Sequence, residues 1–200
     1  MMLFLRVLAN SMGLELNANN IAVAAKLTFG NVLLITNILK LNKLENQQIF
    51  PKAEAFDLSE QLCGALLQFE DAWESKNLNI ETDIEDGVRI RSDSELLTLV
   101  WNNLVSNAVK FTPEGGAIGV SLKTEGDSIV VTVSDTGCGM KAETGKHIFE
   151  KFYQGDTSHA TQGNGLGLAL VKRVMDILSG EIGVQSVYGE GSTFTVKLKR

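Results

Sequence analysis

Three polar side chains near the middle of the chain have the spacing of one face of a helix. Asn103, Asn107 and Lys110 lie in the segment WNNLVSNAVKFTP, four and three residues apart. A side-chain amide oxygen on a rigid helix is a suitable ligand for Mg²⁺, and a lysine ammonium is a point charge for phosphate oxygens. The segment therefore predicts a metal contact at Asn107 and a phosphate contact at Lys110.

Two later segments supply the complementary chemistry. Asp135 ends the apolar run SIVVTVSD, and Gly137 and Gly139 follow it, so a carboxylate at a strand end leads into a loop that can turn sharply. The segment GNGLGLALVKRV opens a helix, where free N–H groups and the positive end of the helix dipole favour phosphate. A carboxylate for a base edge, a metal-binding amide and a phosphate cradle together predict an adenine-nucleotide pocket.

These segments resemble motifs of the sensor histidine kinases of two-component systems, within the wider class of ATPases that share the Bergerat fold. WNNLVSNAVKFTP resembles their N box, DTGCGM the G1 box, IFEKFYQGD the F box and GNGLGLAL the G2 box, in the family's order. The resemblance runs from about Leu16 to Arg200. It implies a catalytic core that uses ATP and Mg²⁺ and transfers the γ-phosphoryl group to a histidine, for relay to a response regulator.

The resemblance and the chemistry together assign a set of candidate ATP contacts, among which Asn107 is also the metal ligand. The set is Asn103, Asn107, Lys110, Phe111, Asp135, Gly137, Gly139, Phe149, Phe152, Tyr153, Gly163, Gly165, Leu166, Gly167, Leu168 and Ser192. For Ser192, a water-mediated contact to adenine and a role in the hairpin turn both remain open.

The residue type at position 103 distinguishes ATP hydrolysis from phosphoryl transfer to a protein side chain. Members of the wider class that hydrolyse ATP carry a glutamate at this position, which activates water. An asparagine amide is not a general base, so Asn103 favours transfer to a protein side chain over hydrolysis.

The segment from about Lys141 to Asn164 mixes Gly, Ser, Thr, Gln and His with Phe149, Phe152 and Tyr153, a composition that predicts a mobile lid anchored by its aromatic residues. The alternative for Phe149 and Phe152 is that they form only the local core of this segment. Gln154 stands where many members have arginine, so charge neutralisation is expected from Mg²⁺, Lys110 and the glycine-segment amides instead.

The chain contains two histidines, His147 and His159, and both fall in the lid region, where surface histidines are expected. The phosphoacceptor histidine is therefore expected upstream of Met1. The alternative is a nucleotide-binding pseudokinase or sensing scaffold that has lost its histidine.

Residues 1–50 and 51–200 are expected to form separate domains, with Pro51 marking the boundary. An apolar stripe over Ile21–Leu41 predicts a long amphipathic helix, which needs a partner to cover it. This helix resembles part of the dimerisation and phosphotransfer domain of histidine kinases. The resemblance implies a homodimer and a response-regulator receiver domain as partners.

The second domain is expected to be a two-layer α/β sandwich, with helices packed on a mixed, largely antiparallel sheet. We expect a helix capped by Asp57 that runs to about Ser75, strands at LNIETDI and VRIRS, and a helix opened near Ser92–Ser94 that carries the N box. Hairpins are expected at AIGVSLKT with SIVVTVSD, and at GEIGVQSVY with STFTVKLK, with a helix from about Gly165 to Leu178 between them.

The composition is that of a globular protein, with 44% hydrophobic and 21% charged residues. A net charge of −6 argues against a nucleic-acid partner. Cys63 and Cys138 form no disulfide or zinc pattern. No apolar run approaches the ~20 residues that span a bilayer. We expect this fragment to be cytoplasmic, and the full-length protein to be attached to the inner or plasma membrane through upstream segments.

Overall fold

The computed structural model describes residues 39, 41, 42, 44, 51–155 and 165–200. The chain divides into two compact units, Met1–Lys43 and Leu44–Arg200. Apart from Leu39 and Leu41, which are helical, the predicted bundle helix over Ile21–Leu41 lies outside the described residues. The domain boundary near residue 50 stays a prediction, and all elements below belong to the second unit.

The described strands form one large sheet and one small one. In spatial order the large sheet contains β2 (Asn79–Ile84), β4 (Ala117–Glu125), β5 (Ser128–Asp135), β7 (Gly191–Lys199) and β6 (Glu181–Val187). β2 pairs with β4 in parallel, and the other neighbours pair antiparallel. The small sheet joins β1 (Glu54–Asp57), which was not predicted, to β3 (Arg89–Ser92). Both predicted hairpins are present.

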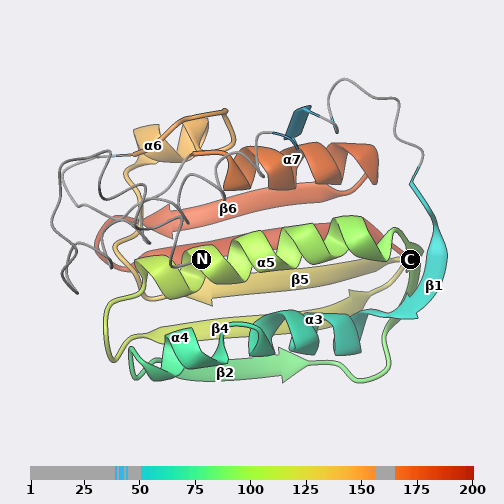
Figure 1. Ribbon diagram of the computed structural model, residues 1–200, viewed down its shortest axis with the longest axis horizontal. Helices are drawn as coiled ribbons and strands as arrows, with labels where there is room; N and C mark the ends of the chain where they lie inside the picture. The colour runs from blue at the N-terminus through green and yellow to red at the C-terminus, as the bar shows by residue number, and fades with distance from the viewer. Residues whose placement is uncertain (1–38, 40, 43, 45–50, 156–164) are drawn as a thin grey trace, which may run out of the picture. The chain divides into compact units, whose positions relative to one another are not determined.

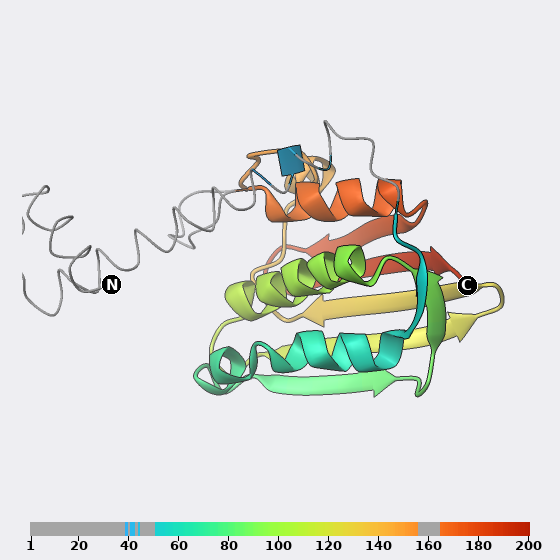
Figure 2. The ribbon, with the colours of Figure 1, turned by 45° about the vertical axis from the view of Figure 1, so that its right-hand side comes forward.

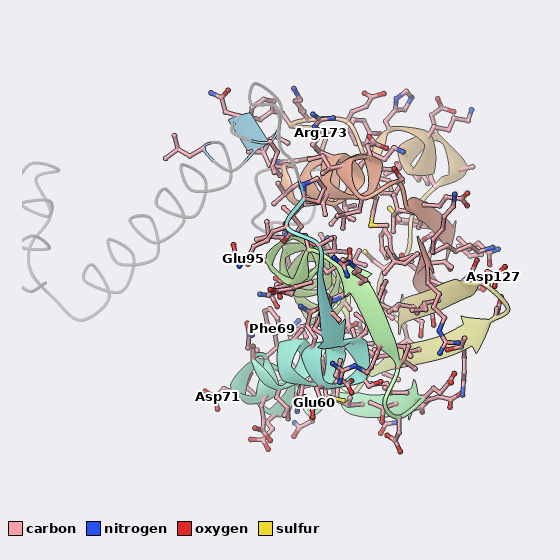
Figure 3. The ribbon with its side chains drawn as sticks, turned by 90° about the vertical axis from the view of Figure 1, so that its right-hand side faces the viewer. Glu60, Phe69, Asp71, Glu95, Asp127 and Arg173 are labelled. Carbon is pink, nitrogen blue, oxygen red and sulfur yellow. The ribbon has the colours of Figure 1, made fainter. Side chains whose placement is uncertain are left out.

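The helices form the second layer. α3 (Leu58–Leu67), α5 (Ser94–Phe111) and α7 (Gly167–Ile177) lie side by side over one face of the large sheet (Figures 1 and 2). Figure 3 looks along the strands and shows Glu95 in the helix layer and Asp127 on the sheet side. The predicted two-layer fold is confirmed. Among the described helices, none has both the length and the apolar character needed to cross a membrane.

The predicted helix from Asp57 to Ser75 is interrupted. The Asp57 carboxylate caps α3 as expected, accepting from the Glu60 N–H at 3.0 Å. However, the helix ends at Leu67, and a second short helix, α4, spans Glu70–Glu74. The Phe69 N–H bonds to the Leu66 carbonyl at 3.0 Å, three residues back, so the last turn tightens and the α-helical pattern stops.

α5 is the central helix of this layer, and its apolar face lies in the core. Asp93 caps its first turn by accepting from the Leu96 N–H at 3.0 Å. Its fully buried side chains include Leu97, Val100 and Trp101. The Trp101 indole donates to Gln61 Oε1 of α3 at 3.0 Å, and Gln61 Nε2 donates back to the Ser94 carbonyl at 2.8 Å. Gln61 thus fixes α5 against α3 through polar contacts within an apolar interface.

We expect Gln61→Leu to lower the free energy of unfolding by about 2 kcal/mol, because it leaves the buried Trp101 N–H without an acceptor. Urea unfolding monitored by tryptophan fluorescence measures this loss. Gln68→Leu, at an exposed position beyond the end of α3, is the control and should change stability little. Equal stabilities for the Gln61 variant and the wild type would contradict the assignment.

Candidate nucleotide-binding site

The predicted motifs meet at one end of the domain. The C-terminal ends of α5 and β5, the N-terminal end of α7 and the short helix α6 (Ala142–His147) all lie at the left-hand end in Figure 1. The N box occupies α5, the G1 box follows β5, and the described part of the G2 box opens α7. Residues 156–164, which include the predicted contact Gly163, lie outside the described residues, so the placement of that part of the predicted lid stays a prediction.

The N box and the G2 box are in direct contact at Asn103. Its Nδ2 donates to the Leu99 carbonyl at 2.7 Å, which fixes the direction of the amide. A Cβ atom added to Gly167 would lie 2.7 Å from Asn103 Oδ1. The absence of a side chain at Gly167 therefore allows α7 to begin against the amide of Asn103.

Asn107, Lys110 and Phe111 follow Asn103 along α5. Within the described residues, the half-buried Asn107 amide has no hydrogen-bond partner. The Lys110 ammonium lies 4.5 Å from the centre of the Phe111 ring, a cation–π distance. Burial lowers the pKa of Lys110. The helix end thus presents an amide and a desolvated cation, both suited to a metal-bound phosphate chain.

Asp135 lies at the end of β5, beside Ser192 of β7. Its Oδ1 accepts from the Gly137 N–H at 2.9 Å. Burial raises the pKa of Asp135, while the backbone N–H groups of Gly137 and Ser192 partly offset this by bonding to the carboxylate. The carboxylate is therefore oriented by the main chain in a partly desolvated position, as an acceptor for an exocyclic amine would require.

The G1 loop is pressed against the β6–β7 hairpin. Gly139 has φ +57°, and a Cβ atom there would overlap the Val187 carbonyl oxygen. The Gly189 N–H donates to the Cys138 carbonyl at 2.8 Å, which closes the contact from the hairpin side. Gly139 meets two requirements, a left-handed conformation and a close backbone approach, that residues with side chains do not satisfy.

Ser186 is a site residue that the sequence did not predict. Its hydroxyl accepts from the Met140 N–H at 2.8 Å, donates to the Gly191 carbonyl at 2.9 Å and lies 3.0 Å from Ser192 Oγ. Ser192, a predicted ATP contact, is buried, with its hydroxyl directed at Ser186. Ser186 lies opposite Ser192 across the hairpin, and this strand register is the signal that could have identified Ser186 as a site residue.

The F box contacts the start of the G2 box through main-chain atoms. The Phe152 N–H donates to the Gly165 carbonyl at 2.9 Å, and a Cβ atom on Gly165 would lie 2.6 Å from Phe152 C. Phe152 itself is 62% exposed, whereas Phe149 and Tyr153 are half-buried. Leu166 is buried and Leu168 is half-buried. The structure thus joins these motifs in one place.

His147 lies at the end of α6, and its imidazole is bound by acidic neighbours. Its Nδ1 is 2.7 Å from Glu150 Oε1, and its Nε2 is 3.6 Å from Glu143 Oε1. The hydrogen bond and charge of Glu150, followed by those of Glu143, raise the pKa of His147. The ring also contacts Tyr153, with centroids 5.5 Å apart, so the histidine links α6 to the F box.

Residues 92–200, which include all of these motifs, match the family described as histidine kinase-, DNA gyrase B- and HSP90-like ATPase. The chain belongs to this family. Its curated relatives include the sensor-like histidine kinase SenX3 of Mycobacterium tuberculosis, 34% identical over 167 residues. That match covers 82% of this chain and 41% of SenX3, so the chain spans about two fifths of the length of this relative.

Solved histidine kinases share the fold. Full-length ShkA in complex with AMPPNP superposes with a TM-score of 0.78 at 26% identity, covering 98% of this chain and 41% of ShkA. The catalytic domain of the histidine kinase ThkA gives a TM-score of 0.67 at 25% identity, covering 74% of this chain and 95% of that domain. The ATPase fold of this family therefore accounts for nearly three quarters of the chain.

We expect Gly139→Ala to disrupt the G1 loop, and Gly126→Ala is its matched control. Both glycines have positive φ, +57° and +61°, but a Cβ at Gly126 would meet nothing within 4 Å. Both variants should lose about 1 kcal/mol to backbone strain, and Gly139→Ala about 2 kcal/mol more because the hairpin must shift. Thermal unfolding measures the loss of stability in each variant, and ATP titration measures the disruption of the G1 loop. Equal losses in the two variants would show that the close contact with Val187 is unimportant.

Proposed function

We propose that residues 51–200 are the ATP-binding catalytic domain of a protein-histidine kinase. The family includes both hydrolases and kinases, and Asn103 is the observation that decides between them. It occupies the position where the hydrolytic members carry glutamate, and it lies against the start of α7, where the phosphates are expected. Because an amide does not activate water, phosphoryl transfer to a side chain is favoured. The likeness to SenX3 supports the same conclusion.

In this proposal each part of the site has a distinct task. Asp135 binds the exocyclic amine of adenine, and Gly137 and Gly139 let the main chain approach the base. Asn107 would contribute an oxygen ligand to Mg²⁺, a hard cation that prefers oxygen ligands. Lys110 and the N–H groups at the start of α7 neutralise phosphate charge. When bound, the metal offsets charge on the transferring phosphoryl group.

Two of the candidate residues, Asn107 and Lys110, present polar groups that such a ligand can engage. Within the described part of the chain, the Asn107 amide has no competing hydrogen bond, and burial already disfavours the charged form of Lys110. The glycines at 137, 139, 165 and 167 each allow a close approach to neighbouring protein atoms that a Cβ atom would prevent, and this brings the G1 and G2 segments against the rest of the site. The remaining contacts in the set, Phe111, Phe149, Phe152, Tyr153, Gly163, Leu166, Leu168 and Ser192, are proposed to line the pocket.

The proposal extends to partners. We propose that residues 1–50 belong to a helical dimerisation domain, that the acceptor is a histidine on such a domain, and that a response-regulator receiver domain takes the phosphoryl group from it. Attachment of the full-length protein to a membrane through further segments is part of the same proposal. The resemblance of the motifs to sensor histidine kinases supports these assignments.

We expect Asp135→Ala to weaken ATP binding at least about tenfold, since a buried or charge-assisted hydrogen bond contributes ~1.5–3 kcal/mol. Asp127→Ala, in the turn that precedes β5 and so far from Asp135, is the matched control and should bind as the wild type does. Isothermal calorimetry with ATP and Mg²⁺ gives both affinities. Equal affinity of the wild type and Asp135→Ala would refute the base contact.

The activity is tested by supplying an acceptor. We expect a histidine-bearing bundle domain, fused upstream of this chain, to acquire acid-labile label from γ-labelled ATP, and to acquire none when Mg²⁺ is chelated before ATP is added. Without the acceptor, release of phosphate to water should be negligible, because Asn103 provides no base. Rapid hydrolysis would assign the chain to the ATPases instead.

Two further outcomes of that experiment count against parts of the proposal. Acid-labile label on the unfused chain would make His147 or His159 an acceptor, against the assignment of the acceptor to a separate domain. Normal ATP binding with no transfer to the fused domain would support a nucleotide-binding pseudokinase.

A further inference from the structure

Lys76 lies outside every recognised motif, yet it contacts the end of the helix that carries the N box. It occupies the turn between α4 and β2, and its side chain is partly buried. Its ammonium group donates to three carbonyl oxygens, those of Val109 at 2.7 Å, Lys110 at 3.1 Å and Thr112 at 2.9 Å. An ammonium has three protons, so this arrangement can use all of its donors.

The Val109 and Lys110 carbonyls are among those that a helix leaves unpaired in its last turn, and Thr112 is the residue that caps this helix. The helix ends at Phe111, and Thr112 donates both its N–H, at 3.0 Å, and its hydroxyl, at 2.6 Å, to the Ala108 carbonyl. Carbonyls beyond Ala108 therefore need another donor. Lys76 supplies it, and its positive charge lies at the negative end of the helix dipole.

The main chain around Lys76 is itself held in place. The Lys76 carbonyl accepts from the Gly115 N–H at 2.9 Å, and the Asn79 N–H donates to the Gly116 carbonyl at 2.8 Å. The loop that follows α5 and the turn that carries Lys76 are thus joined by side-chain and main-chain bonds. The lysine is anchored at both ends, and so it can restrain the helix end against movement.

We propose that Lys76 is a positioning residue for the nucleotide site. It holds the last turn of α5 so that Asn107, Lys110 and Phe111 meet the phosphates and the metal. Movement of this turn also reaches the G1 loop, because a Cβ on Gly137 would lie 2.7 Å from the Phe111 carbonyl oxygen. This inference rests on the proposed function, since it assigns Lys76 a task within the same site.

The test compares Lys76→Met and Lys76→Arg with the wild-type chain. ATP affinity is measured by calorimetry with and without Mg²⁺, at a temperature where circular dichroism shows each variant to be folded. Lys76→Met should weaken Mg²⁺–ATP binding about tenfold and reduce the gain in affinity that Mg²⁺ provides. Lys76→Arg keeps a cation with several donors and should recover most of both quantities.

Ser59→Ala is the matched control for a loss of stability alone. The Ser59 hydroxyl donates to the Glu85 carbonyl at 2.7 Å and accepts from the Val88 N–H at 3.0 Å, so it fastens α3 to the turn between β2 and β3. Its removal should lower the melting temperature without changing the ATP affinity of the folded chain or the Mg²⁺ effect. A purely structural Lys76 would behave in the same way.

The outcomes separate this inference from the proposed function. Wild-type affinity and an unchanged Mg²⁺ effect in Lys76→Met would overturn the inference and leave the proposed function standing. Failure of the wild-type chain to bind ATP would overturn both. If Lys76→Met does not fold, the side-chain ¹⁵N signal of Lys76 is followed in the wild type, where a shift on adding Mg²⁺–ATP supports the inference and an unchanged signal contradicts it.

Discussion

The packing of α5 is the constraint on which the nucleotide site depends. Its apolar face is buried in the core, and Gln61 of α3 fixes its rotation through the Trp101 indole. Because the apolar face is buried, Asn103, Asn107 and Lys110 lie on another side of the helix, and Asn103 there meets the start of α7 at Gly167. A core contact made in the first half of the helix therefore determines the direction of polar groups in its second half.

The two half-buried ionisable groups of the site, Lys110 and Asp135, have pKa values that partial burial shifts in opposite directions. Burial lowers the pKa of Lys110 and raises the pKa of Asp135, so in both cases the charged form is disfavoured without a ligand. A phosphate chain would favour the charged lysine, and an exocyclic amine would favour the charged carboxylate. In the proposed complex, one nucleotide gives each of these two groups a partner that favours its charged form.

Much of the fold was predictable because its signals are local. Alternation of apolar and polar residues located both hairpins, and the caps at Asp57 and near Ser94 located helix starts. The sequence did not predict β1, because this short strand is defined by its pairing with β3. It did not predict the break at Phe69 either, because that break depends on a single tightened turn. Both features follow from contacts that periodicity does not encode.

In the site too, local signals were predictable from the sequence, whereas contacts between distant segments were not. Glycine spacing indicated where the main chain turns, but not that Gly139 is pressed against the Val187 carbonyl. The motifs identified the residues of α5, whereas Ser186 and Lys76 lie in β6 and in the turn after α4, where serine and lysine are ordinary surface residues. Their contacts form only when segments distant in sequence come together, so the linear pattern does not reveal them.

The parallel pairing of β2 with β4 has a consequence for how this domain folds. Parallel strands are not joined by a tight turn, and here the connection between them passes through β3 and α5. That sheet contact brings together residues far apart in sequence, and such contacts slow folding because a long loop must close first. Early formation of α5 would shorten the flexible connection between β2 and β4, since the turns of a helix form from local hydrogen bonds. The helix proposed to hold the phosphates would then also serve as an early scaffold for the edge of the sheet.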